Sequence, residues 1–272
     1  MAIRVGAVNY LNTKPLIEGF GTFAPHAELC LDLPSRLADR LAAGDLDVAL
    51  IPVIEYFRAG RGQYSIVPGV SIASHGPVWS VTLYSRVPWN QVRSVSLDEG
   101  SRTSAALARI LLEKKHGLQP KMLPLPIGES GAEVETDAVL LIGDRAMRSS
   151  LPGFPYSYDL GEEWFAWKGL PFVFAIWAVR PGVDLQGVDE ALRQAKHKGL
   201  EHVAAIARRE SARLHVDEEW CRRYLSEALC FDLGPREVAG LREYYGHARD
   251  LGLAPAGVDI DFYRPGHLVE SR

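Results

Sequence analysis

The sequence predicts an α/β fold of two lobes, because short apolar strands alternate with segments of helical spacing through most of its 272 residues. Residues 46–52 and 137–143 are the clearest strands, and their largely apolar character is typical of sheets covered on both faces. From residue 185 onward the chain has helical spacing and little strand pattern. These observations favour two α/β blocks followed by a helical tail.

The first block alternates strands and helices, which predicts a mainly parallel sheet. Pro15 and Pro34 lie in first helical turns, where a missing N–H has no cost, and Gly44 ends the second helix. In chain order, we predict a strand to residue 8, a helix over 11–20, a strand over 28–33, a helix over 34–43, a strand over 46–52 and a short helix from 52.

The second block predicts a second sheet of the same type, and helices follow it. Its expected elements are strands over 92–97, 122–125, 137–143 and 172–179 and a helix over 101–116, and the tail is helical over 185–209, 217–229 and 235–251.

We expect the chain to cross between the lobes twice, near residues 86–90 and 180–182, where prolines lie among polar residues. The first lobe would then comprise residues 1–86 and 181–272, and the second lobe residues 87–180. Two lobes joined by two crossings describe a bilobal solute-binding fold, in which a central cleft closes on its ligand by hinge bending.

Composition excludes several classes of function. A net charge of −4, without a basic run, argues against a nucleic-acid partner. Three cysteines without a CxxC pair suit a reducing compartment. The N-terminus lacks the pattern of a signal peptide, and the most apolar run, residues 170–179, is too short to span a bilayer. We therefore expect a cytoplasmic protein without a membrane segment; its oligomeric state is not encoded in these patterns.

The first candidate site lies where the opening strand runs into Asn9 and Asn12. Either Asn12 or Thr13 is suited to cap the next helix, and amide donors beside free backbone N–H groups suit an oxygen-rich anion. The alternative is that Asn9 and Asn12 only cap that helix.

The second candidate is Ser80, which follows the Gly76-Pro77 turn. Trp79, Val81 and Leu83 alternate with Ser80 and Thr82, so that one face of the predicted strand carries hydroxyls. These hydroxyls either face water or, beside an expected crossing, face the cleft.

The third candidate is the helix start at Ser101, Arg102, Thr103 and Ser104. One hydroxyl suffices for an N-cap, so three hydroxyls and an arginine exceed the structural need. Free N–H groups and the helix dipole would hold a carboxylate here.

The fourth candidate is Gly143 and Asp144 at the end of a strand, where ligands of open α/β sheets bind. Asp144 is equally suited to cap the following turn, paired with Arg145. Phe172, in an aromatic segment, either lines an apolar pocket or belongs to the core.

Familiar cofactor motifs, and the GxSxG motif of serine hydrolases, are missing from the sequence. It has no GxGxxG, Walker A, HExxH, CxxC or GxSxG motif, and its eight histidines lack metal-ligand spacing. We therefore expect no nucleotide, flavin or metal cofactor.

Five segments together resemble the menaquinone-biosynthesis family of the futalosine pathway, across nearly the whole chain: residues 5–16, 76–83, 101–104, 141–144 and 169–174. The resemblance implies a periplasmic-binding-protein-like fold of type II and one of two activities. One branch dehydrates chorismate, and the other forms 1,4-dihydroxy-6-naphthoate. In the second branch the strand matching residues 140–144 ends in a histidine that is thought to act as a base, whereas here Gly143 stands at that place.

The dehydratase branch is therefore the expected one. It implies conversion of chorismate to 3-[(1-carboxyvinyl)oxy]benzoate without a cofactor, and the two carboxylates of chorismate suit two anion-binding helix starts. We expect Asn12 and Ser80 to take part in catalysis, and Asn9, Ser101, Arg102, Thr103, Ser104, Gly143, Asp144 and Phe172 to bind substrate. The alternatives are the naphthoate-forming reaction and a non-enzymatic protein that binds small carboxylates.

Overall fold

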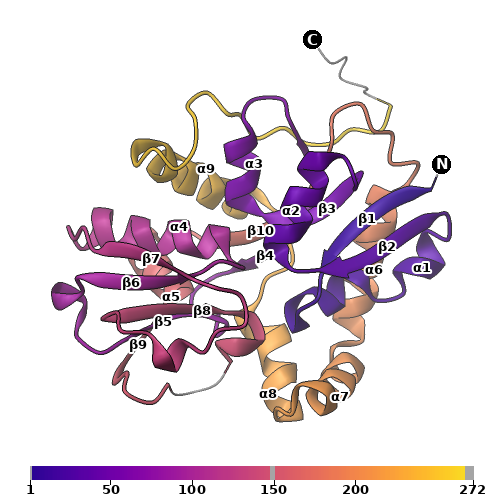
Figure 1. Ribbon diagram of the computed structural model, residues 1–272. Coiled ribbons are helices and arrows are strands. Elements are labelled where there is room, and N and C mark those ends of the chain that lie inside the picture. Colours follow the sequence, from indigo (N-terminus) through magenta and orange to yellow (C-terminus); the bar gives the residue numbers. More distant parts are fainter. Residues whose placement is uncertain (1, 148–150, 267–272) are drawn as a thin grey trace.

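The computed structural model describes residues 2–147 and 151–266 and contains two five-stranded sheets, one in each lobe (Figure 1). The first sheet has the order β2-β1-β3-β10-β4. Its strands are β1 (Ile3–Val8), β2 (Ala27–Asp32), β3 (Val48–Pro52), β4 (Ser65–Ser74) and β10 (Phe172–Val179). β1 pairs in parallel with β2 and β3, whereas β10 is antiparallel to β3 and β4.

The second sheet repeats this arrangement with the order β7-β6-β8-β5-β9. Its strands are β5 (Val81–Ser85), β6 (Ser94–Asp98), β7 (Lys121–Leu125), β8 (Ala138–Ile142) and β9 (Tyr156–Asp159). β6 is parallel to β7 and β8, and β5 is antiparallel to β8 and β9. Both sheets are therefore mixed, with four strands running in one direction and one strand, β10 or β5, inserted in the opposite direction. The expectation of a mainly parallel sheet holds except for that inserted strand.

The two inserted strands also show where the chain passes between the sheets. It leaves β4 and enters β5 through residues 75–80, and it returns to β10 through residues 169–171. The expected crossings near 86–90 and 180–182 are wrong. Pro88 precedes a short 3₁₀ turn within the second lobe, and Pro181 follows β10 in the first. Phe172–Val179 is a strand as predicted, but it lies in the first sheet.

Most helices agree with the sequence prediction in place, but the first does not. Residues Leu11–Ile17 form a 3₁₀ helix (η1) with Tyr10 at its N-cap, so neither Asn12 nor Thr13 caps it. Pro15 lies inside this helix, where it has no N–H to donate. The helices are α1 (Phe20–Phe23), α2 (Pro34–Ala43), α3 (Val53–Ala59), α4 (Arg102–Ile110), α5 (Leu160–Lys168), α6 (Val188–Glu201), α7 (Val203–Leu214), α8 (Glu218–Arg223) and α9 (Pro235–Asp250).

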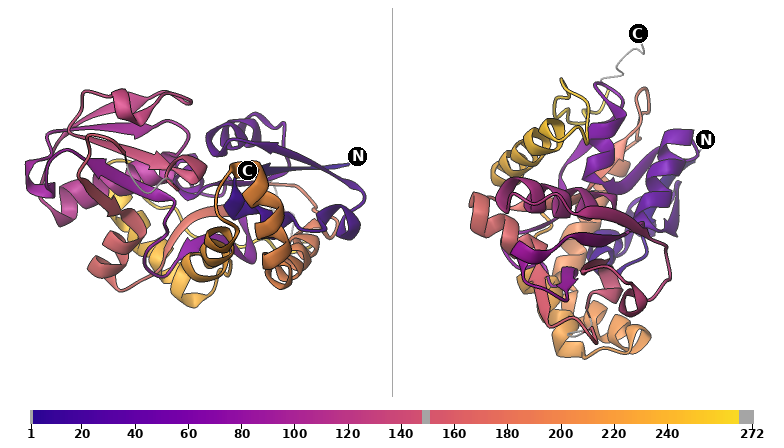
Figure 2. Two further views of the ribbon diagram at one scale, coloured as in Figure 1. Left: turned by 90° about the horizontal axis from the view of Figure 1, so that it is seen from below. Right: turned by 60° about the vertical axis from the view of Figure 1, so that its left-hand side comes forward.

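The helical tail lies along one side of both lobes (Figure 2, orange to yellow). α6 packs against η1, α1 and β4 of the first lobe, as expected for the tail. α9 contacts both β10 and α4, and the Tyr244 hydroxyl donates a hydrogen bond to the Thr103 carbonyl at 3.2 Å. The end of the tail therefore joins the first lobe to the second.

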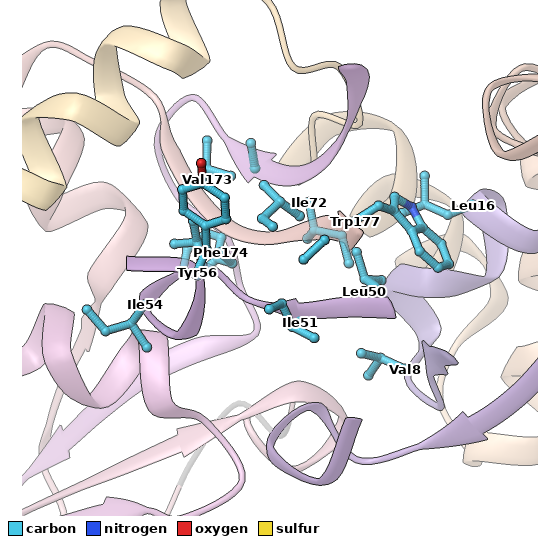
Figure 3. Packing of buried hydrophobic residues seen from close by; sticks show 14 of the residues in the cluster. Val8, Leu16, Leu50, Ile51, Ile54, Tyr56, Ile72, Val173, Phe174 and Trp177 are labelled. Atoms are coloured by element: carbon cyan, nitrogen blue, oxygen red, sulfur yellow. The ribbon is translucent and has the colours of Figure 1, made fainter. Parts of the chain in front are cut away.

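The core of the first lobe is formed by the apolar strands around β3 and β10. Val8, Leu50, Ile51, Ile72 and Trp177 are all nearly or completely buried there (Figure 3). β3 is buried along its whole length, which agrees with its apolar sequence. Among the helices of the described residues, none combines the length and apolar character that crossing a membrane requires.

Candidate active site

A pocket lies between the two lobes, and about 540 Å³ of space there is not filled by protein atoms, part of it open solvent. Strand ends of both sheets and the start of α4 surround it. It is lined by Val8, Tyr10, Asn12, Pro34, Pro52, Ile72, Val78, Ser80, Val81, Ser101, Thr103, Ser104, Ile142, Gly143, Phe174 and Ala175. The structure thus brings together Asn12, Ser80, Ser101, Thr103, Ser104 and Gly143, six of the residues expected to form the site.

None of the described residues that line this pocket carries a charge at neutral pH, and none is a histidine. Its polar groups are hydroxyls, one side-chain amide and backbone N–H groups, all of which can donate hydrogen bonds. The remaining wall is apolar. Such a pocket suits a compact organic anion held by neutral donors, and it offers no side chain that is an effective base at neutral pH.

Tyr224, a completely buried residue of the tail, is hydrogen-bonded to both Asn12 and Ser80. The Tyr224 hydroxyl donates to Ser80 Oγ at 2.8 Å, and its phenol is also hydrogen-bonded to the Asn12 side chain. Burial raises the pKa of Tyr224 well above its ordinary value, which keeps the phenol protonated. Since Ser80 Oγ accepts from Tyr224, its own proton is free to donate into the pocket.

The backbone before Ser80 is fixed by the carboxylate of Asp159. This carboxylate accepts from the Val78 amide at 2.9 Å and the Trp79 amide at 2.7 Å, and it also caps α5 through the Gly161 amide at 2.9 Å. Trp79 has a φ of 61°, a conformation that is uncommon for any residue other than glycine. The Asp159 bonds hold this turn, so the position of Ser80 depends on a residue of the second lobe that lies far away in sequence.

The start of α4 presents its hydroxyls to the same pocket. Ser101 occupies the N-cap position, yet its side chain makes no capping hydrogen bond. Thr103 Oγ1 accepts from the amide of Ile54 in α3 at 3.2 Å, which leaves the Thr103 proton free to donate. Together with the free N–H groups of the first turn, Ser101, Thr103 and Ser104 present a group of hydrogen-bond donors, which is chemistry suited to an anion.

Gly143 allows Tyr10 to form a wall of the pocket. Its φ is +56°, and a Cβ at this position would lie 3.1 Å from the Tyr10 ring. Any larger side chain would be strained and would displace that ring. Burial raises the pKa of Tyr10 to about 12, so this phenol is a hydrogen-bond donor and not a base at neutral pH.

Three residues expected to bind substrate lie outside the pocket. Asn9 is exposed and accepts from Lys14 Nζ at 3.2 Å. Arg102 forms ion pairs across the lobes, with Asp39 of α2 at 2.8 Å and Glu55 of α3 at 3.3 Å. Phe172 is buried against Trp164 and Tyr244. Arg102 therefore holds the lobes together, and Phe172 supports Phe174, an aromatic residue that does line the pocket.

Asp144 also lies outside the pocket, behind Gly143. Its Oδ1 accepts from the Leu11 amide at 3.4 Å, and its Oδ2 lies 3.9 Å from Arg213. Burial raises the pKa of Asp144, while the Leu11 amide and Arg213 act in the opposite direction. The expected pairing of Asp144 with Arg145 is wrong, because Arg145 pairs with the buried carboxylate of Asp98. Asp144 instead connects the loop of Asn12 to the second lobe.

The sequence analysis did not name Tyr10, Phe174 or Tyr224 as site residues, although the first two lie within candidate segments. Tyr10 lies between Asn9 and Asn12, within the first candidate segment, so the sequence did point to its neighbourhood. Phe174 shares a strand with Phe172. Alternation of side chains along a strand normally shows which face of the sheet a residue lies on, but the register shifts between β10 and β4 interrupt that alternation. Tyr224 lies far along the chain in the tail, where no local pattern points to the pocket.

The sequence of this chain is similar to those of proteins of one metabolic family. The model of a family described as menaquinone biosynthesis matches residues 3–250. The chorismate dehydratase of Thermus thermophilus is 31% identical over 245 residues, which cover 81% of this chain and 86% of that protein. The chorismate dehydratase of Campylobacter jejuni is 24% identical over 245 residues, 90% of this chain and 93% of that protein.

Solved structures show the same fold at low sequence identity. A protein from Archaeoglobus fulgidus matches with a TM-score of 0.75 and 16% identity, over 93% of this chain and 98% of that chain. The periplasmic aliphatic sulphonate binding protein of Escherichia coli matches with a TM-score of 0.66 and 15% identity, over 100% of this chain and 94% of that chain. The expected periplasmic-binding-protein-like fold is therefore confirmed.

Proposed function

We propose that this chain, which belongs to the menaquinone-biosynthesis family, is a chorismate dehydratase that converts chorismate to 3-[(1-carboxyvinyl)oxy]benzoate and water. The observation that carries the proposal is the pocket itself, in which Asn12, Ser80 and the hydroxyls of α4 converge and the described lining contains no charged side chain. The 31% identity to the Thermus enzyme over most of both chains supports the same reading. The naphthoate-forming alternative is not favoured, because Gly143 offers no base.

The start of α4 would hold the ring carboxylate of chorismate. The C3 proton is made acidic by conjugation to that carboxylate, so negative charge flows toward it as the proton leaves. Fixed hydroxyl and N–H dipoles from Ser101, Thr103 and Ser104 stabilise this charge without reorganising. Binding and catalysis would therefore share one set of donors.

The base would be the substrate's own second carboxylate. The enolpyruvyl group is attached at C3, so its carboxylate can reach the C3 proton within the same molecule when the pocket folds the side arm. The electrons of the C3–H bond form the C3–C4 double bond, and the 4-hydroxyl leaves as water with the transferred proton. This proposal agrees with a pocket whose described lining has neither a carboxylate nor a histidine.

Asn12 and Ser80 would orient the side arm and the departing 4-hydroxyl. Both are tied to the buried Tyr224, which fixes their side chains before substrate binds. Preorganised donors of this kind contribute most when charge develops on the group they face. Their role is to position groups and not to accept the proton.

We place the reaction in the futalosine pathway and in the cytoplasm, with chorismate as the partner and no nucleic acid. The three cysteines, Cys30, Cys221 and Cys230, are all free, which suits a reducing compartment.

Dehydration is expected to need no metal. Protein treated with excess chelator and then freed of it should convert chorismate at the rate of untreated protein, since the described pocket lining contains no set of metal ligands. The appearance of benzoate absorbance measures the rate. A loss of turnover that a divalent metal restores would contradict this expectation.

Removing the Ser104 hydroxyl should weaken chorismate binding. A hydrogen bond to a charged group contributes about 1.5–3 kcal/mol, so Ser104→Ala should raise the dissociation constant roughly 10- to 100-fold. Thr103→Ala should act in the same direction, although it also removes the bond from Ile54. Titration calorimetry is the measurement, and Ser226→Ala, at an exposed serine of the tail, is the matched control. Unchanged chorismate affinity of both Ser104→Ala and Thr103→Ala would rule out the carboxylate site at α4.

A further inference from the structure

A second group of reactive side chains lies outside the substrate pocket, at the first crossing between the lobes. His75 is the first residue after β4, Cys230 lies in the tail, and Glu237 lies in the first turn of α9. Backbone hydrogen bonds join Cys230 to Ala73 in both directions at 2.8 Å, so the tail runs beside the end of β4. None of these three side chains lines the substrate pocket.

The three possible ligand atoms are close together. The imidazole, thiol and carboxylate atoms all lie within 4.8 Å of one another, and His75 Nε2 is 2.6 Å from Glu237 Oε1. The Glu237 side chain is only 6% exposed, and its other oxygen accepts from the Gly234 amide at 2.9 Å. This bond fixes the carboxylate so that Oε1 points toward His75 and Cys230.

We propose that His75, Cys230 and Glu237 form a binding site for a thiophilic divalent cation of the Zn²⁺ type. Imidazole nitrogen, thiolate sulfur and carboxylate oxygen are the protein ligands of Zn²⁺, at about 2.0–2.3 Å from the ion. Tetrahedral ligands at those lengths lie roughly 3.3–3.8 Å apart, so small side-chain rotations suffice to bring the three atoms into position. Within the described residues, this is the one group of three such side chains close enough to hold an ion.

The surroundings permit a cation and a fourth, water ligand. An open cavity adjoins the cluster and is lined by all three residues, so solvent reaches the site. Three cations share that lining. Lys196 is neutralised by Asp232 at 2.6 Å and also bonds the Gly69 carbonyl at 2.8 Å. Arg193 pairs with Asp189 and Glu190, and Arg236 donates to the Gly169 carbonyl at 3.4 Å. A bound ion would therefore replace the single hydrogen bond between His75 and Glu237 with three metal bonds.

An ion at this place would link the first crossing to the helix that contacts both lobes. His75 begins the segment that leads to Ser80, and Glu237 belongs to α9, which packs on β10 and α4. Gly240 of the same helix lies against Pro171 of the second crossing. The site is independent of the dehydration chemistry, because its residues do not touch the substrate pocket.

Cobalt substitution tests the proposal directly. Metal-free full-length protein is titrated with Co²⁺, and a thiolate-to-cobalt charge-transfer band in the near ultraviolet should reach its maximum at one ion per chain and be displaced by Zn²⁺. Cys230→Ser should lose the band, whereas Cys30→Ser, at the partly buried cysteine beside Arg40, should keep it. His75→Gln, at a half-exposed side chain, should weaken binding at least roughly 10-fold.

Thermal unfolding with and without Zn²⁺ gives an independent readout. Wild type and Cys30→Ser should unfold at a higher temperature with the ion, and Cys230→Ser should not, since an ion that binds only the folded state stabilises it. Equal melting temperatures of the metal-free variants show that both fold. A band that persists in Cys230→Ser, or wild-type protein that binds neither ion, would overturn the proposal.

Discussion

Asn12→Ala and Ser80→Ala should each lower kcat for chorismate dehydration by about 10²-fold, the usual cost of removing one preorganised donor or misplacing the reacting groups. Both side chains line the pocket and are bonded to the buried Tyr224, so each has a defined orientation in the pocket. Steady-state kinetics on the purified variants is the measurement. The effect should fall on kcat more than on KM, because in the proposed mechanism these donors act as the 4-hydroxyl departs.

Two variants serve as controls for this prediction. Asp144→Asn should keep substantial turnover, because Asp144 lies behind Gly143 and contacts Leu11 and Arg213 instead of lining the pocket. Asn9→Ala removes the same type of side chain as Asn12→Ala, but at an exposed position, and should leave kcat unchanged.

The opposite pattern would identify a different base. If Asp144→Asn abolished turnover while chorismate affinity and the melting temperature stayed as in wild type, Asp144 would be the proton acceptor. The substrate-assisted mechanism would then be wrong. Full activity of both Asn12→Ala and Ser80→Ala would contradict their role in the reaction.

Gly199→Ala should both destabilise the protein and impair turnover. Gly199 lies in α6, where a Cβ would overlap the backbone of Pro15 and lie 2.5 Å from its Cα. Backbone cannot rotate away as a side chain can, so α6 and η1 must separate. Overpacking of this kind costs about 1–3 kcal/mol, which in a chain of this size lowers the melting temperature by roughly 2–12 °C.

The loss of turnover follows from the same contact, because η1 carries Asn12. Displacement of η1 moves the Asn12 amide relative to Ser80, and a misplacement on the order of 1 Å is enough to slow a positioned reaction substantially. Thermal unfolding and kcat are measured on the same preparation.

Gly246→Ala is the matched control in α9. No atom of the described residues would lie within 4 Å of a Cβ at this helical glycine, so the substitution should raise the free energy of unfolding by about 0.4–1 kcal/mol. Its turnover should equal that of wild type. If Gly199→Ala were as stable and active as Gly246→Ala, the close packing of α6 on η1 would not position the active site.

The fold class could be predicted from the sequence because each strand and helix is indicated by the residues of its own segment. Residues 46–52 and 137–143 became β3 and β8, and Gly44 ends α2 as its sequence suggests. The crossings were wrong because they depend on long-range pairing. β10 inserts between β3 and β4, and β5 between β8 and β9, and neither partner can be read from the strand's own residues.

The residues of the candidate site also fall into two groups: those found from the local sequence and those whose role depends on tertiary structure. Asn12 and the hydroxyls of α4 lie where a strand leads into a helix. Ligands bind at such places in open α/β sheets, because the first N–H groups of the helix are free to bind an anion. Ser80 lies directly before β5 and was found from the turn and the alternation of its own segment. The role of Arg102 was not predictable, because its partners Asp39 and Glu55 come from the other lobe. The place of Tyr224 at the pocket and the grouping of His75, Cys230 and Glu237 depend equally on tertiary structure, since His75 and Cys230 are far apart in sequence.

The most direct test of the account is mass spectrometry of the products formed from two separate substrates, chorismate and cyclic dehypoxanthine futalosine. Purified protein should convert chorismate to a product lighter by one water, with the absorbance of a substituted benzoate, and should leave the second compound unchanged. Asn12→Ala protein should form this product far more slowly. Formation of 1,4-dihydroxy-6-naphthoate from the second compound, or binding of chorismate without any loss of water, would contradict the assignment of this chain as a chorismate dehydratase.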